Sequence, residues 1–185
     1  MAKGKLFVFS GASGVGKSTV LKKVMETRQD LVFSVSATTR KPRPGEQDGV
    51  HYYFVSADTF RQMIAEDAFV EYDGHMDSYY GTPKAQLEEK LSRGNVILDI
   101  DPNGAFQVKK ARPDAVLIFI APPSMEVLLD RLTGRGDTSP EQIRVRQERA
   151  AWEMEQSKRY DHLVINDQLE ECVRQVLEII ESSGD

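Results

Sequence analysis

Residues near the start of the chain combine the glycines, lysine and hydroxyl that phosphate binding requires. Gly11 to Ser18 read GASGVGKS, which matches G-x-x-x-x-G-K-[ST] at every fixed position. Glycines allow successive backbone N–H groups to point toward one phosphate, and a helix N-terminus adds further donors. Lys17 is long enough to reach the β- and γ-phosphates, and the Ser18 hydroxyl can bind Mg²⁺. The motif predicts binding of a nucleoside triphosphate with magnesium.

The elements around this motif are those that a phosphate-binding loop needs. Leu6 to Phe9 form an apolar run typical of a buried strand, and Val20, Leu21 and Val24 follow with helical spacing. A chance match in an ordinary strand–turn–helix connection is the alternative. The order strand, glycine loop, helix favours the phosphate-binding loop.

A second group of cations lies between residues 32 and 55. Arg40, Lys41 and Arg43 are interspersed with prolines that stiffen the backbone. Such a run is often a solvated loop, but hydroxyls and tyrosines nearby could contact a phosphate or a base: Ser36, Thr38, Thr39, Tyr52 and Tyr53. The residues alone leave a solvated loop and a second anion site equally open.

Acidic side chains end a second apolar strand, predicted over Asn95 to Ile100. Asp99 and Asp101 lie at its carboxyl end, the edge at which parallel sheets bind ligands. One of them is a candidate for holding Mg²⁺ through water. Alternatively, Asp101 only caps the next helix, predicted over 102–112.

Five arginines surround a glycine-containing segment in the last third of the chain: Arg131, Arg135, Arg144, Arg146 and Arg149. In an acidic protein they suggest a mobile cover that brings positive charge onto phosphates. The alternative is a solvated helix, capped by Ser139, whose arginines pair with Glu141, Glu148 and Glu153. The sequence does not decide between the two.

Composition narrows the class of protein. The chain has 185 residues, 40% hydrophobic and 29% charged, with a net charge of −5, which argues against broad binding to nucleic acid or to anionic membranes. The chain has one cysteine, Cys172, and we predict that its thiol is buried and structural. The three histidines are scattered and form no recognisable zinc-binding cluster with it. With no signal peptide or membrane-spanning run, we expect a cytoplasmic protein. Monomer and homo-oligomer both remain open.

Strands that alternate with helices predict an α/β fold, with a parallel sheet covered by helices on both faces. We expect a helix over Ala57 to Glu66 capped by Ser56, and a strand over Ala68 to Asp73 with Phe69 and Val70 inward. Residues 75–83 are expected to form a loop, followed by a helix that starts at Pro83 with Thr82 as its N-cap. Two segments, 34–84 and 126–157, interrupt this alternation of strands and helices and are expected to be insertions.

Several of these motifs occur together in one family, and the chain resembles guanylate kinase, the enzyme that phosphorylates GMP from ATP. The resemblance runs nearly end to end and rests on the following segments: GASGVGKST, SVSATTRKPRPGEQDGVHYYF, FVEY, YYGTP, LDID with GA two residues on, FIAPPS, RLTGRG and IND. It implies a P-loop NTPase-type sheet with a small mixed α/β insertion that binds the nucleoside monophosphate, and a helical lid. The implied parts are core 1–33, GMP-binding subdomain 34–84, core 85–125, lid 126–157 and core 158–185.

The resemblance also implies roles for individual residues. Arg40, Arg43, Tyr52 and Tyr80 would hold the GMP phosphate, and Ser36, Glu71 and Thr82 would read guanine. Asp99 and Asp101 would serve the nucleotide and metal network. Lys17, Arg40, Arg131, Arg135 and Arg146 would assist transfer, and Asn166 would lie near the adenine. ATP would bind the loop formed by Gly11, Ala12, Ser13, Gly14, Val15, Gly16, Lys17, Ser18 and Thr19, with Mg²⁺ on Ser18 and, through water, on Asp101.

The expected reaction is a direct, magnesium-dependent transfer of the ATP γ-phosphoryl group to GMP or dGMP, with no phosphoenzyme. The main alternative is an inactive guanylate-kinase-like module that binds phosphopeptides, but such modules usually lack an intact phosphate-binding loop. A kinase for AMP or UMP is disfavoured by the set Ser36, Glu71 and Thr82. A GTPase switch should carry an N-K-x-D motif, which this sequence lacks.

Overall fold

The computed structural model describes residues 4–75, 77–133 and 140–184. The chain forms two units, one of Met1–Phe7 with Asp30–Ala115 and one of Val8–Gln29 with Val116–Asp185. Strand β1 (Leu6–Gly11) begins in the first unit and ends in the second. The predicted insertion 34–84 therefore falls within the first unit, and the predicted lid 126–157 falls within the second.

The first unit contains a pair of parallel strands, as its apolar runs predict. Strand β7 (Val96–Asp99) pairs in parallel with β2 (Val32–Phe33), and Val96 donates to the Lys5 carbonyl just before β1. Val96, Ile97 and Leu98 are fully buried, as expected for a strand covered on both faces. Acidic Asp99 thus lies where the buried strand ends.

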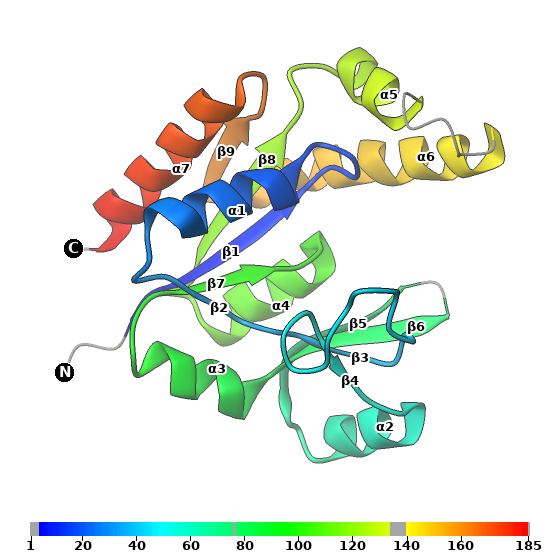
Figure 1. Ribbon diagram of the computed structural model, residues 1–185, viewed down its shortest axis with the longest axis vertical. Helices are drawn as coiled ribbons and strands as arrows, with labels where there is room; N and C mark the ends of the chain where they lie inside the picture. Colours follow the sequence, from blue (N-terminus) through cyan, green and yellow to red (C-terminus); the bar gives the residue numbers. More distant parts are fainter. Residues whose placement is uncertain (1–3, 76, 134–139, 185) are drawn as a thin grey trace. The chain divides into compact units, whose positions relative to one another are not determined.

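The rest of the first unit is a four-stranded sheet in the order β4-β3-β6-β5. Its strands are β3 (Ala37–Thr38), β4 (Tyr53–Phe54), β5 (Phe69–His75) and β6 (Ser78–Pro83). Strand β3 is parallel to β4, and β6 is antiparallel to both β3 and β5. Figure 1 shows this sheet with helix α2 (Ala57–Ala65) at one end.

The predicted loop over 75–83 is wrong, because β6 runs through most of it. Glycine and proline suggested a loop, but Gly81 is needed for packing: an added Cβ would lie 2.9 Å from the Phe69 ring. Thr82 is consequently a strand residue and not a helix cap. The next helix, α3 (Lys84–Leu91), has Pro83 as its N-cap residue and starts one position later than predicted.

Helix α2 begins as its sequence predicts, since the Ser56 hydroxyl accepts the Thr59 N–H at 3.0 Å. Its Phe60 stacks on Phe69 with ring centroids 4.5 Å apart. The prediction for β5 was half right: Phe69 is buried, but Val70 is partly exposed and Glu71 is buried instead. Alternation along the strand therefore directs a carboxylate inward.

The second unit holds the glycine loop. Strand β1 leads to helix α1 (Lys17–Thr27), and strand β8 (Val116–Ala121) pairs in parallel with β9 (His162–Ile165), Ile118 opposite His162. Helix α7 (Leu169–Gly184) packs against α1, and the two lie side by side in Figure 1. Buried Cys172, Val173, Val176 and Ile180 line the inner face of α7, so the prediction of a buried thiol is confirmed.

Three further helical segments complete the second unit: α5 (Met125–Thr133), α6 (Pro140–Gln156) and the short 3-10 turn η1 (Ser157–Arg159). Helix α5 packs against α6. Arg135 and the predicted cap Ser139 lie outside the described residues. Among the helices that the structure describes, none has the length and apolarity needed to cross a membrane.

Candidate functional site

The glycine loop has the backbone that a phosphate cradle requires. Gly14 and Gly16 have φ of +87° and +92°, values that residues with a Cβ rarely adopt. Gly16 is the N-cap residue of α1 and supplies no side-chain cap, and Ser18 is exposed in the first turn. No side chain caps α1 at Gly16, and the positive end of the helix dipole lies at the glycine loop, where it favours an anion.

Two residues from elsewhere in the second unit fix the middle of this loop. The Asn166 amide donates to the Val15 carbonyl at 2.8 Å, and Asn166 is only 7% exposed. Arg131 donates to the Asn166 carbonyl at 3.1 Å and to the Val15 carbonyl at 3.4 Å. The structure thus brings Arg131 and Asn166, two predicted site residues, to the loop backbone.

The arginines of α6 do not share one role. Arg144 pairs with Glu148 across 3.8 Å, and Arg149 pairs with Glu153 at 3.0 Å, which are contacts that the solvated-helix alternative predicted. Arg146 is exposed. The Arg149 guanidinium also lies over the Trp152 ring, 4.6 Å from its centroid. Arg144 and Arg149 therefore have carboxylate partners within α6, whereas Arg131 contacts the loop backbone.

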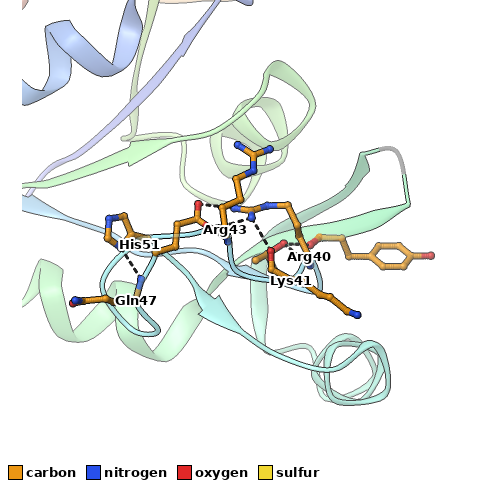
Figure 2. Close-up of polar contacts among 8 residues, drawn as sticks. Arg40, Lys41, Arg43, Gln47 and His51 are labelled. Atoms are coloured by element: carbon orange, nitrogen blue, oxygen red, sulfur yellow. Dashed lines mark hydrogen bonds and ion pairs between the residues drawn. The ribbon is translucent and has the colours of Figure 1, made fainter. Parts of the chain in front are cut away.

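In the first unit, the loop after β3 gathers the other predicted cations (Figure 2). Arg40 donates two hydrogen bonds to the Glu46 carboxylate, at 2.8 and 2.9 Å, and a third to the Lys41 carbonyl at 2.8 Å. The backbone N–H of Arg43 also donates to Glu46, at 2.7 Å. The Arg40 bonds, followed by the Arg43 N–H, lower the pKa of Glu46 to about 2. A carboxylate thus orients the guanidinium from one side.

Two tyrosines complete this group of residues. The Arg40 guanidinium lies 5.3 Å from the centre of the Tyr52 ring, and the Tyr52 ring meets Tyr80 edge-on at 5.9 Å. Burial raises the pKa of Tyr52, so its hydroxyl is a proton donor at neutral pH. The structure therefore brings together the side chains of Arg40, Tyr52 and Tyr80, three of the four residues predicted to hold a phosphate; the fourth, Arg43, joins them through its backbone N–H.

The predicted base-reading residues lie on the neighbouring strands. Thr82 on β6 is opposite Glu71 on β5, and its hydroxyl donates to the Glu71 carboxylate at 2.6 Å. Both residues are buried, with Glu71 only 4% exposed. Ser36 precedes β3, whose register pairs Ala37 with Gly81 and so carries Ser36 toward Thr82.

Glu71 is held where a carboxylate is costly. Burial raises the pKa of Glu71 to about 7, the Thr82 hydroxyl opposes that rise, and the negative charge of Asp101 adds to it. A buried carboxyl group whose pKa lies near neutral is typical of functional sites. When ionised, the Glu71 carboxylate favours a ligand that donates hydrogen bonds to it.

Helix α4 (Pro102–Ala111) packs against β5 and leaves room for this carboxylate. A Cβ at Gly104 would lie 2.6 Å from Glu71 Oε2, so no other residue fits there without moving the carboxylate. Gln107 accepts the Tyr72 N–H at 3.2 Å and donates to the Tyr72 carbonyl at 2.9 Å, as a neighbouring strand would. Asn103 adds a bond to Asp73 at 2.8 Å.

Asp101 does cap α4, as the alternative interpretation proposed: its Oδ1 accepts the Gly104 N–H at 2.9 Å. This bond involves one of the two carboxylate oxygens. Asp99 is half-buried at the end of β7. No cluster of three or more His, Cys, Asp or Glu side chains suited to a metal ion occurs within 4–75, 77–133 and 140–184.

Sequence reasoning missed the residues that orient others, namely Glu46, Gly104 and Gln107. Glu46 follows Arg40 by six positions within a proline-rich loop, a spacing that no helix or strand periodicity marks. Gly104 and Gln107 lie three apart on one helix face, which could have indicated a shared contact. What that face contacts is set by the tertiary fold.

Comparisons with known proteins agree with this geometry. The family model described as guanylate kinase matches residues 3–183. A protein named guanylate kinase from Thermus thermophilus is 52% identical over 179 residues, which cover 96% of this chain and 81% of the relative. One of the same name from Clostridium perfringens is 46% identical, with 96% and 83% covered.

A solved structure shares the fold. The crystal structure of guanylate kinase from Anaplasma phagocytophilum superposes with a TM-score of 0.80 at 31% identity, and the match covers 99% of this chain and 87% of that one. The resemblance seen in the sequence motifs is therefore confirmed along nearly the whole chain. This chain belongs to the guanylate kinase family.

Proposed function

We propose that the chain transfers the γ-phosphoryl group of ATP directly to GMP or dGMP, in line and with Mg²⁺, to give ADP and GDP or dGDP. The observation that carries this proposal is the buried Glu71 carboxylate, held by Thr82 on the strands next to the Arg40 loop. Membership of the guanylate kinase family supports the reaction class.

Glu71 suits guanine and not adenine. A carboxylate accepts hydrogen bonds from guanine N1–H and the 2-amino group, whereas adenine has an acceptor at N1 and no 2-amino group. AMP would leave a buried carboxylate facing a lone pair, and sites of this kind discriminate by about 10⁴-fold or more. The Ser36 hydroxyl would donate to O6 or N7 of the base, whereas Thr82, whose single hydroxyl proton is donated to Glu71, would act by holding that carboxylate for guanine.

The acceptor phosphate needs positioning more than activation. Its second pKa is about 6, so it is largely ionised at neutral pH and requires no general base. Arg40, Arg43, Tyr52 and Tyr80 would hold it. The rigid fork of a guanidinium matches phosphate oxygens and keeps its charge.

On the ATP side, the loop from Gly11 to Thr19 would hold the donor phosphates, and Lys17 would reach the β- and γ-oxygens. Arg131, Arg135 and Arg146 would supply positive charge to the loose transition state. Asn166 would lie beside the adenine as well as support Val15, its observed partner.

The Ser18 hydroxyl would hold Mg²⁺, with Asp99 or Asp101 acting through water. Mg²⁺ keeps several waters and uses few protein ligands together with substrate phosphates, so these residues fit it without a dense carboxylate cluster. Bound there, the ion would neutralise the charge that develops on the phosphate oxygens. Lys17 and the arginines would orient the reacting groups.

The inactive phosphopeptide-binding module is disfavoured because the loop is intact in sequence and in backbone, with Gly16 at positive φ ahead of Lys17 and Ser18. A coupled ADP-release assay with ATP and Mg²⁺ tests the proposal. We expect turnover with GMP and dGMP and none with AMP, UMP or CMP. Turnover with another base would refute the role of Glu71, and silence with all five from a folded, ATP-binding protein would support the module.

A further inference from the structure

One buried charged group of the second unit has no part in the reaction described above. Glu153 on α6 is only 7% exposed, whereas Glu148, five positions earlier on the same helix, is exposed. Ala150, three positions before Glu153, is fully buried, so this face of α6 is covered by protein. Buried carboxylates are rare unless partners compensate their charge.

The partners of Glu153 connect the phosphate-binding loop to α6. Its Oε2 accepts the backbone N–H of Ser13 at 2.8 Å, across 140 positions of sequence. Its Oε1 accepts from Arg149 Nε at 3.0 Å, and Arg149 is in turn placed over Trp152. Each carboxylate oxygen thus has a partner.

The charge of Glu153 also acts on the loop lysine. Burial raises the pKa of Glu153, while the Ser13 N–H, Arg149 and the positive charge of Lys17 lower it. The Glu153 carboxylate therefore binds the backbone of the loop and also attracts the positive charge of Lys17.

Side chains from outside the loop hold its backbone at Val15 and at Ser13. Asn166 and Arg131 hold the Val15 carbonyl, and Glu153 holds the Ser13 N–H two residues earlier. We propose that Glu153 is a positioning residue that fixes Ser13 and thereby sets the shape of the phosphate-binding loop for ATP. It also joins the loop to the helix that carries Arg146.

This inference rests on the loop being the ATP site, and steady-state kinetics with the full chain tests it. Glu153→Ala removes the acceptor for a buried N–H, and we expect a roughly 10- to 100-fold loss of kcat/KM for ATP, with KM for GMP unchanged. Glu153→Gln keeps an acceptor oxygen and should recover most of that loss. Glu148→Ala breaks the exposed pair with Arg144 in the same helix and should behave as wild type.

Calorimetry with GMP alone and a thermal melt verify that each variant is folded. A wild-type KM for ATP in Glu153→Ala, or equal losses in the Ala and Gln variants, would overturn the positioning role. So would a parallel loss of GMP affinity, since a general defect would then explain the kinetics. Lys17→Ala distinguishes failure of the proposed function from failure of the Glu153 inference. If Lys17→Ala kept full turnover, the loop would not be the ATP site and both proposals would fail. If Lys17→Ala is inactive while Glu153→Ala is normal, only the present inference fails.

Discussion

Replacing Glu71 by glutamine should make the protein more stable and less active. Glutamine has nearly the same shape, and its carbonyl oxygen can accept the Thr82 hydroxyl that now donates to the carboxylate at 2.6 Å. What the substitution removes is a negative charge in a site that is only 4% exposed. The change in stability must therefore depend on pH.

The sign follows from the raised pKa of Glu71, about 7 in the folded chain against an ordinary value of 4.5. Between these values the folded chain binds more protons than the unfolded chain, so the free energy of unfolding falls as pH rises. The gap between the two pKa values corresponds to about 3 kcal/mol, lost by about pH 7 to 8. Glu71→Gln should be more stable than wild type by up to that amount at pH 8, and similar to it below pH 4.5.

Urea unfolding followed by circular dichroism at pH 4.5, 6, 7 and 8 measures this difference. Glu66→Gln, an exposed carboxylate in the same unit, is the control and should follow the wild-type profile. Parallel pH profiles for wild type and Glu71→Gln would show that the buried carboxyl carries no such cost.

The same variant should lose kcat/KM for GMP by roughly 10²-fold, since a charged acceptor is lost and an amide N–H₂ faces donors of guanine. Near wild-type kinetics with GMP would refute the base-reading role. GMP should also bind the ionised carboxylate, so binding at pH 6.5 should release protons. Calorimetry in two buffers of different ionisation enthalpy measures this release. The part due to the GMP phosphate persists in Glu71→Gln, and the part due to Glu71 does not.

Three further substitutions test the elements around the sites. Gly104→Ala places a Cβ 2.6 Å from Glu71 Oε2, so KM for GMP should rise although alanine favours a helix by about 1 kcal/mol; an unchanged KM would contradict the tight fit. Gln107→Ala removes both bonds to the Tyr72 backbone, and urea unfolding should report a loss of about 1–2 kcal/mol; no loss would mean that water replaces the amide. Lys17→Ala should abolish transfer while calorimetry still detects GMP binding; weakened GMP binding would contradict separate roles.

The sequence predicts most reliably where chemistry and local structure coincide. Gly16 adopts the positive φ that the turn needs and Lys17 begins α1, so the motif and the local backbone agree. Ser56 likewise marks a helix start through a bond made within one turn. Such features depend on neighbours in sequence, and we predicted them correctly.

Prediction fails where distant segments decide the outcome. Residues 78–83 contain glycine and proline and were assigned to a loop, but pairing with β5 and the Phe69 ring makes them a strand. Thr82 then points at Glu71 and cannot cap the next helix. The contacts of Glu46 and Gly104, and the bond from the Ser13 N–H to Glu153, depend in the same way on partners that no periodicity marks, although the identity of each residue was visible.

The two groups of the first unit that we propose face the substrate differ in how far their geometry is already fixed by the fold. Glu71 is already buried, bonded to Thr82 and enclosed by α4, so guanine would find its acceptor in place, and the cost of burying that charge is met by folding and not by binding. Arg40, by contrast, already donates two hydrogen bonds to a carboxylate. A phosphate arriving there must share the guanidinium with Glu46 or displace it. Base selectivity should therefore depend on a fixed geometry, whereas phosphate affinity should depend on how readily the Arg40–Glu46 pair rearranges.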